Sequence, residues 1–257
     1  MNLRLALEMA QFAQLAYGKT PFPAGLDYLM VDMLPAADVP CLRVRAPKRV
    51  TFAVRGTQDL RGWLLDAEIA LRPYSPSRPG VKTHTGFWRT VDAAWPRLAP
   101  LAEQAHAKGL PVLVTGHSKG AAESCLFTYR LGVERGIIAA GRYSFGEPRS
   151  LNRAGSRDYE RLGVPTWRVL DEDDVVCRIP WRLGVYRHVG QTAFFNAWGN
   201  MQENEPWYAH LPSDVYALVM DALRREDALV RDHAIDLYID RLNARLAADG
   251  EEDAEAA

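Results

Sequence analysis

The stretch Val112-Leu113-Val114-Thr115-Gly116-His117-Ser118-Lys119-Gly120-Ala121-Ala122 decides the fold of this chain. It opens with a short apolar run, typical of a buried strand, and closes with the small residues of a helix. Between them stands the pattern G-x-S-x-G, which in this context forms a sharp strand-to-helix turn, a nucleophile elbow. Side chains at Gly116 and Gly120 would collide with the neighbouring strand and helix. We therefore expect Ser118 at the tip of the turn, with its hydroxyl exposed.

Ser118 also has a simpler interpretation, because serine often caps the amino terminus of a helix. The strand, the two glycines and the small helix residues together favour the nucleophile. A serine hydroxyl is a weak nucleophile at neutral pH and needs a base, which in turn needs an orienting carboxylate. Behind an elbow of this kind the acid and then the histidine follow the serine along the chain.

Strand-like and helix-like segments alternate outward from the elbow. The strand-like segments are 41–44, 50–54, 111–115, 142–145 and 166–170, and the helix-like ones are 1–17, 89–107, 121–132, 212–224 and 228–246. This alternation predicts an α/β fold with a mostly parallel central sheet and helices on both faces. Sites in such sheets form beyond the carboxyl ends of the strands.

The composition is that of an ordinary globular protein. The 257 residues are 48% hydrophobic and 25% charged, which excludes a disordered, collagen-like or polyelectrolyte chain. We expect one domain over residues 1–246. Residues 247–257 hold five acidic residues and no basic one, so we predict an acidic disordered tail. The rest has a net charge of +4 although the whole chain has −1, and its spread-out bases argue against nucleic acid as a partner.

The cysteines and the amino-terminal segment indicate the cellular compartment in which the protein is expected. Cys41, Cys125 and Cys177 are odd in number and widely spaced, which indicates neither a disulfide framework nor a metal site. Polar residues interrupt the apolar residues of 1–17, whose helical spacing predicts a helix packed on the body and not a signal peptide. No run of 18 apolar residues predicts a transmembrane segment. We expect a cytoplasmic protein, and the oligomeric state stays undetermined.

An acid and a base are available after the serine. The acidic run 171–174 directly follows the strand 166–170, and we favour Asp174 because Val175 and Val176 behind it would anchor the loop. The other acids of the run would form a solvated turn.

Three histidines follow the acidic run. His233 lies just before the final helix, His210 lies in a loop that contains proline, and His188 has the surroundings of a strand residue with a structural hydrogen bond. Spacing alone does not decide between His233 and the other two.

Six blocks of the sequence, in order between residues 49 and 242, carry a resemblance to a known family. They are Phe52 to Thr57 with Trp63 and Asp66, His84 to Phe87, Gly116 to Gly120, Ser144 to Arg149, Asp174 to Pro180, and Asp232 with His233. Together they resemble the class 3 lipases, also called fungal-type triacylglycerol lipases.

The resemblance implies an α/β-hydrolase fold and a serine carboxylic-ester hydrolase, a lipase or esterase that works through an acyl-enzyme without a cofactor or metal. It implies Ser118 as nucleophile, Asp174 as acid and His233 as base. It also implies an oxyanion hole formed by Thr57 and by the backbone N–H of Lys119. Such donors stabilise the charge that develops on the ester oxygen.

In the family, the segment after the oxyanion residue forms a lid. Here Leu60, Trp63 and Leu64 have near-helical spacing, so they can form an amphipathic lid, a wall of the acyl pocket, or an ordinary surface helix. His84 and Arg149 also fall in family motifs. We expect His84 to make a hydrogen bond beneath the site and Arg149 to tie a loop.

The expected partner is a lipid or small-molecule ester, with transient contact at a lipid interface. Glu147 and Cys177 stand where the family pattern has other residues, and the expected lack of a signal peptide and of disulfides also departs from the secreted members. The resemblance therefore does not extend to triglyceride preference or to secretion. Alternatives are a phospholipase, a polyester or short-chain esterase, or a non-catalytic lipid-binding module of the same fold.

Overall fold

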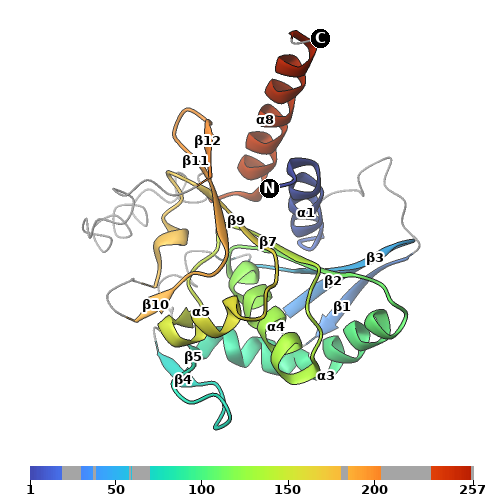
Figure 1. The fold of residues 1–257 in the computed structure, drawn as a ribbon, viewed down its shortest axis with the longest axis vertical. Coiled ribbons are helices and arrows are strands. Elements are labelled where there is room, and N and C mark those ends of the chain that lie inside the picture. The colour runs from blue at the N-terminus through green and yellow to red at the C-terminus, as the bar shows by residue number, and fades with distance from the viewer. Residues whose placement is uncertain are drawn as a thin grey trace.

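The computed structural model describes residues 1–18, 30–36, 39–57, 59, 70–180, 185–203 and 233–255. In this part of the chain an eight-stranded sheet has the order β1-β2-β3-β6-β7-β9-β11-β12 (Figure 1). The strands are β1 (Met30–Ala36), β2 (Val39–Ala46), β3 (Arg49–Val54), β6 (Val112–His117), β7 (Gly141–Phe145), β9 (Thr166–Asp171), β11 (Gln191–Phe195) and β12 (Met201–Gln202). Neighbours from β3 to β11 are parallel, and the outer pairs are antiparallel. The predicted, mostly parallel sheet is confirmed.

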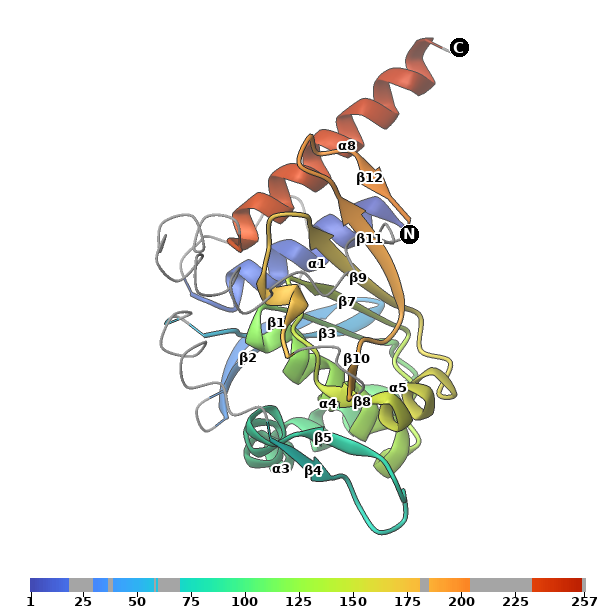
Figure 2. The same ribbon diagram turned by 90° about the vertical axis from the view of Figure 1, so that its left-hand side faces the viewer.

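Helices cover both faces of this sheet, as predicted (Figure 2). One face carries α1 (Leu3–Leu15) and α8 (Ile235–Glu255), and the other carries α3 (Thr85–Ala107) and α4 (Lys119–Arg135). Beside them lie α5 (Arg153–Glu160), the 3-10 helix η1 (Val176–Arg178), and a second sheet of β10 (Tyr186–Arg187), β8 (Leu151–Asn152), β5 (Lys82–His84) and β4 (Leu71–Pro73). No helix in the described ranges has both the length and the apolar character needed to cross a membrane.

The strand that leads into the elbow is buried on both faces. Val112 and Val114 of β6 join the core under α3 and α4, whereas Leu113 joins the core under α1 and α8. Successive side chains of a strand point to opposite faces, so both cores need apolar residues from β6. This explains why the segment is continuously apolar instead of alternating.

The amino-terminal helix is fixed on the same strand. Asn2 caps α1 by accepting a hydrogen bond from the Leu5 amide at 2.9 Å, and Met9 and Phe12 are buried against the sheet. The Thr115 hydroxyl in β6 donates to the Met9 carbonyl at 3.1 Å. The predicted packing of this helix on the body is confirmed.

The carboxyl-terminal region differs from the prediction. Where the sequence predicts an acidic tail, α8 continues through residues 247–255 and projects away from the sheet (Figure 1). Alanine and glutamate favour a helix, and Arg245 pairs with Asp249 one turn later at 2.5 Å. The described part of the predicted helix 228–246 begins at Ile235, and the predicted helix 212–224 lies outside the described residues.

A buried ion pair explains the unusual Glu147. Its Oε2 lies 2.9 Å from Arg142 Nη2 and accepts a hydrogen bond from the Ser144 hydroxyl at 2.5 Å. Neither charged side chain is more than 1% exposed. The carboxylate therefore neutralises a guanidinium that lies in the interior at the carboxyl side of β7.

We expect Glu147→Gln to lower the free energy of unfolding by about 3 to 5 kcal/mol, because it leaves a buried guanidinium without a counter-charge. Urea unfolding measures this loss. The matched control is Glu103→Gln, which breaks an exposed pair with Arg135 (N–O distance 2.6 Å) and should cost less than about 1 kcal/mol. Equal losses in the two variants would contradict this account of Glu147.

Candidate active site

The turn after β6 has the strained geometry of an elbow. Ser118 has φ 60° and ψ −135°, and it is the single non-glycine residue with positive φ in the described part of the chain. A Cβ on Gly116 would lie 2.5 Å from the Gly120 carbonyl oxygen, and a Cβ on Gly120 would lie 2.3 Å from the Val54 carbonyl oxygen. The interpretation of both glycines is confirmed, since no side chain fits at either position.

The side chain of Ser118 is not a helix cap. It makes no capping hydrogen bond to α4, so the simpler interpretation is wrong. Its backbone N–H donates to the Phe145 carbonyl at 2.9 Å, which fixes the turn against β7. The Ser118 hydroxyl is itself buried and has no hydrogen-bond partner among the described residues, although we expected it to be exposed.

Asp174 is buried at the end of the acidic run. It is 1% exposed, and its Oδ1 accepts from the Val176 amide at 2.8 Å. Asp171 is also buried, so the expected solvated turn is wrong for this acid. Asp171 pairs instead with Arg241 at 3.1 Å, and the Glu172 carboxylate accepts from the Ala197 amide at 2.8 Å.

His233 lies directly before α8 and contacts Asp174. The distance from His233 Nδ1 to Asp174 Oδ2 is 2.7 Å. A carboxylate can only accept, so Nδ1 carries the proton and Nε2 is left with a lone pair. His233 Nε2 is buried and, like the Ser118 hydroxyl, has no partner in the described ranges.

Of the two other candidate histidines, the structure describes only His188, which lies away from Asp174. His188 Nε2 bonds to the Cys177 carbonyl at 2.9 Å, as expected of a structural histidine. His210 lies outside the described residues.

Tyr238, one turn into α8, was not predicted and completes the surroundings of Asp174. Its hydroxyl donates to Asp174 Oδ2 at 2.5 Å, and the Cys177 thiol lies 3.4 Å from the same oxygen. Burial by itself would raise the pKa of Asp174, but His233 and the hydrogen bonds from Tyr238 and the Val176 amide together lower it below the ordinary value. Asp174 is therefore held as a carboxylate.

Gly146 lies against the acid and the histidine. It has φ 59°, and a Cβ there would lie 2.7 Å from His233 Cε1 and 2.8 Å from Asp174 Oδ2. The residue after β7 must be glycine for the His233 ring and the Asp174 carboxylate to fit. The sequence contained this glycine in a family motif, without a spacing that indicated its role.

Of the two candidate oxyanion residues, Lys119 belongs to the elbow and Thr57 follows the loop residue Gly56 that packs against it. A Cβ on Gly56 would be 3.2 Å from Ser118 Cβ, so the loop that carries Thr57 lies against the serine. The Thr57 hydroxyl exchanges hydrogen bonds with Asp59 in a turn. Lys119 is the first residue of α4, where backbone N–H groups lack an intrahelical partner.

Some residues singled out in the sequence lie elsewhere. Leu60, Trp63 and Leu64 lie outside the described residues. Arg149 donates to the Pro180 carbonyl at 3.0 Å and so ties a loop, as expected. His84 caps α3, because its Nδ1 accepts from the Phe87 amide at 3.4 Å.

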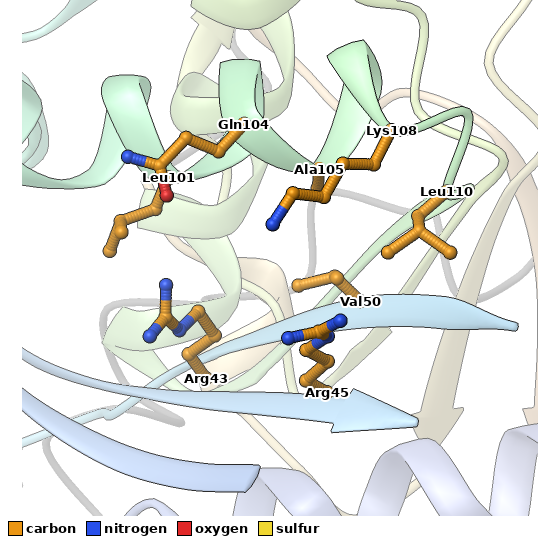
Figure 3. A pocket seen from close by; sticks show the side chains of 8 residues that line it. All are labelled: Arg43, Arg45, Val50, Leu101, Gln104, Ala105, Lys108 and Leu110. Carbon is orange, nitrogen blue, oxygen red and sulfur yellow. The ribbon is translucent and has the colours of Figure 1, made fainter. Parts of the chain in front are cut away.

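A cavity of about 110 Å³ lies at the opposite edge of the sheet, between β2 and the end of α3 (Figure 3). Arg43 and Arg45 reach from β2 toward α3, which ends beside Lys108. Cations are favoured at a helix carboxyl terminus, so this basic lining has a structural explanation. None of the predicted site residues lines the cavity.

Comparison with known proteins gives a consistent result. The family model described as Lipase (class 3) matches residues 51–183. The phospholipase A1-Igamma1, chloroplastic, of Arabidopsis thaliana is 29% identical in an alignment over 169 residues that covers 54% of this chain and 33% of that protein. The lipase of Rhizomucor miehei is 28% identical in an alignment over 149 residues that covers 56% of this chain and 41% of that protein. The chain thus spans well under half the length of these relatives.

Solved structures share the fold. A Rhizomucor miehei lipase propeptide complex superposes with a TM-score of 0.67 at 21% identity, over 78% of this chain and 70% of that one. The lipase of Rhizopus microsporus var. chinensis superposes with a TM-score of 0.65 at 23% identity, over 79% and 75%. At these identities the likeness establishes the fold alone.

Buried neutral histidines predict a loss of stability in acid. Burial lowers the pKa of His84 to about 4, so between pH 6.5 and 4 the unfolded chain binds a proton that the folded chain does not. Stability must therefore fall with pH in this window. His84→Asn keeps a good helix cap and removes the titrating ring. The free energy of unfolding of the variant, measured relative to that of wild type, should therefore rise by about 2 kcal/mol from pH 7 to pH 5. Urea unfolding at the two pH values checks this, and an unchanged difference would refute it.

Proposed function

The chain belongs to the class 3 lipase family, and from this premise we propose that it hydrolyses carboxylic esters of lipids through an acyl-enzyme formed on Ser118. One observation carries the proposal. His233 is bonded to Asp174 at 2.7 Å, while His233 Nε2 and the Ser118 hydroxyl are both buried without a partner among the described residues. A base with a lone pair and a hydroxyl held by a strained turn are the parts that acyl transfer requires.

In the first step His233 Nε2 takes the hydroxyl proton as Ser118 Oγ attacks the ester carbonyl carbon. Asp174 holds the Nδ1–H tautomer and stabilises the imidazolium that forms. The backbone N–H groups of Thr57 and Lys119 donate to the oxyanion of the tetrahedral intermediate. Each such donor lowers the barrier by about 2.7 to 4 kcal/mol.

The intermediate collapses when His233 returns the proton to the leaving alcohol, which departs and leaves the acyl group on Ser118. Water then gives a proton to His233 and attacks the acyl carbonyl. A second collapse releases the carboxylic acid and restores the Ser118 hydroxyl. The cycle uses side chains and backbone of this chain and one water molecule per ester.

Lipid esters are the proposed substrates because the chain belongs to the class 3 lipase family. A phospholipid is the second candidate, favoured by the similarity to a phospholipase A1. Hydrolysis of p-nitrophenyl esters of rising chain length, with and without an emulsion, separates a lipase from a short-chain esterase. Release of fatty acid from phosphatidylcholine vesicles tests the phospholipase.

We expect Ser118→Ala to lower kcat on the order of a million-fold and Asp174→Asn roughly ten-thousand-fold, because the serine forms the intermediate and the acid only supports the base. Ester hydrolysis with purified protein measures both. The matched control is Ser124→Ala, which removes another buried hydroxyl from α4 (2.6 Å from the Ala121 carbonyl) and should keep the wild-type kcat.

A fluorophosphonate probe tests the same serine without a substrate. Covalent labelling of wild type and of Ser124→Ala, but not of Ser118→Ala, is expected. An unlabelled wild type would support the alternative of a non-catalytic lipid-binding module. Wild-type hydrolysis by Ser118→Ala would refute the proposed nucleophile.

A further inference from the structure

The residue before the nucleophile, His117, joins two distant segments. Its ring is buried, with Nε2 2.7 Å from the His233 carbonyl oxygen and Nδ1 2.8 Å from the Tyr17 hydroxyl. Both ring nitrogens are therefore used. The mechanism above assigns no step to either His117 or Tyr17.

Only one assignment of donor and acceptor atoms fits the two hydrogen bonds of the His117 ring. A carbonyl can only accept, so His117 Nε2 carries the hydrogen. Burial, with His233 close by, lowers the pKa of His117 to about 3, so the ring is neutral at physiological pH. Nδ1 then has a lone pair and accepts from the Tyr17 hydroxyl.

Tyr17 also touches the oxyanion loop. Its hydroxyl packs so closely on Gly56, the residue before Thr57, that a Cβ there would lie 2.2 Å away. The same Cβ would lie 2.7 Å from the His117 carbonyl oxygen. Tyr17 immediately follows α1, which is fixed on β6, so its position does not depend on either loop that it contacts.

We propose that Tyr17 and His117 are positioning residues, a hydrogen-bonded bridge that sets the backbone of His233 and the loop at Gly56 relative to Ser118. The proposal rests on the proposed function and adds residues to it. His233 lies just before α8, where Asp174 holds its ring and the bridge holds its main chain. A misplacement of about 1 Å at a reacting group can cost about a hundred-fold in rate.

A neutral His117 ring also avoids repulsion with the positive charge that develops on His233 during the reaction. The ring centroids of His117 and His233 are 4.7 Å apart. A protonated His117 would repel the imidazolium that forms on His233, and in a buried site such repulsion is weakly screened. A ring with one proton on Nε2 supplies the hydrogen bond without the charge.

Tyr17→Phe removes only the hydroxyl. We expect kcat to fall about 10- to 100-fold with KM within two-fold of wild type, because placement of the reacting groups changes and substrate binding does not. The matched control is Tyr159→Phe, which removes a tyrosine hydrogen bond that is more deeply buried, 2.9 Å to the Thr166 hydroxyl at the far end of β9. It should lower thermal stability by at least as much and keep the wild-type kcat. Equal kcat in the two variants overturns the bridge.

His117 is tested by replacement and by spectroscopy. His117→Gln can still donate to the His233 carbonyl and should keep at least ten times the kcat of His117→Phe. In ¹⁵N spectra of histidine-labelled wild type, His117 should remain the Nε2–H tautomer from pH 5 to pH 8. An Nδ1–H tautomer, or titration in that range, contradicts the arrangement.

These results separate the two proposals. If wild type hydrolyses esters and is labelled by the fluorophosphonate while Tyr17→Phe matches Tyr159→Phe, only the bridge is refuted. If wild type is neither active nor labelled, the proposed function is refuted, and the positioning role falls with it whatever tautomer the spectra report.

Discussion

The steric constraint at the Ser118 turn governs the rest of this structure. β3 and the first turn of α4 approach so closely that Gly120 has no room for a Cβ, and Gly116 is confined by the same turn. This contact forces Ser118 into a positive φ and brings the loop at Gly56 against it. The proposed nucleophile and its candidate oxyanion donors thus depend on the same close packing of β3 against α4.

The second requirement is that the Asp174 carboxyl group stays ionised in the interior of the protein. Asp174 is buried, which alone would favour its neutral form, yet His233, Tyr238 and the Val176 amide all stabilise the carboxylate. Arg142 of β7 and Glu147, which follows β7, form a buried ion pair in which each charge has its counter-charge. Both departures from an apolar interior therefore have their counter-charge or donors in place.

The large-scale architecture follows from local patterns. The apolar run of β6, the strand-like segments 41–44 and 50–54 and the long helices were each predicted from residues next to one another in the chain. The short strands β4, β5, β8, β10 and β12 were not, because two or three residues carry no periodicity. Residues 247–255, whose acidic composition predicted a tail, continue α8 in the structure, because alanine and glutamate also have a high helix propensity.

The sequence by itself determined the elbow, the alternation of strands and helices that gives an α/β fold, and a short set of acids and histidines that could serve the serine. Only the tertiary structure decided which of them meet. Asp174 and His233 are 59 residues apart, and Tyr17 and His117 are 100 apart. Their hydrogen bonds exist because α1 and α8 pack on the same face of the sheet beside β6. Local pattern cannot specify that packing, because it depends on surfaces that form only when the whole chain has folded.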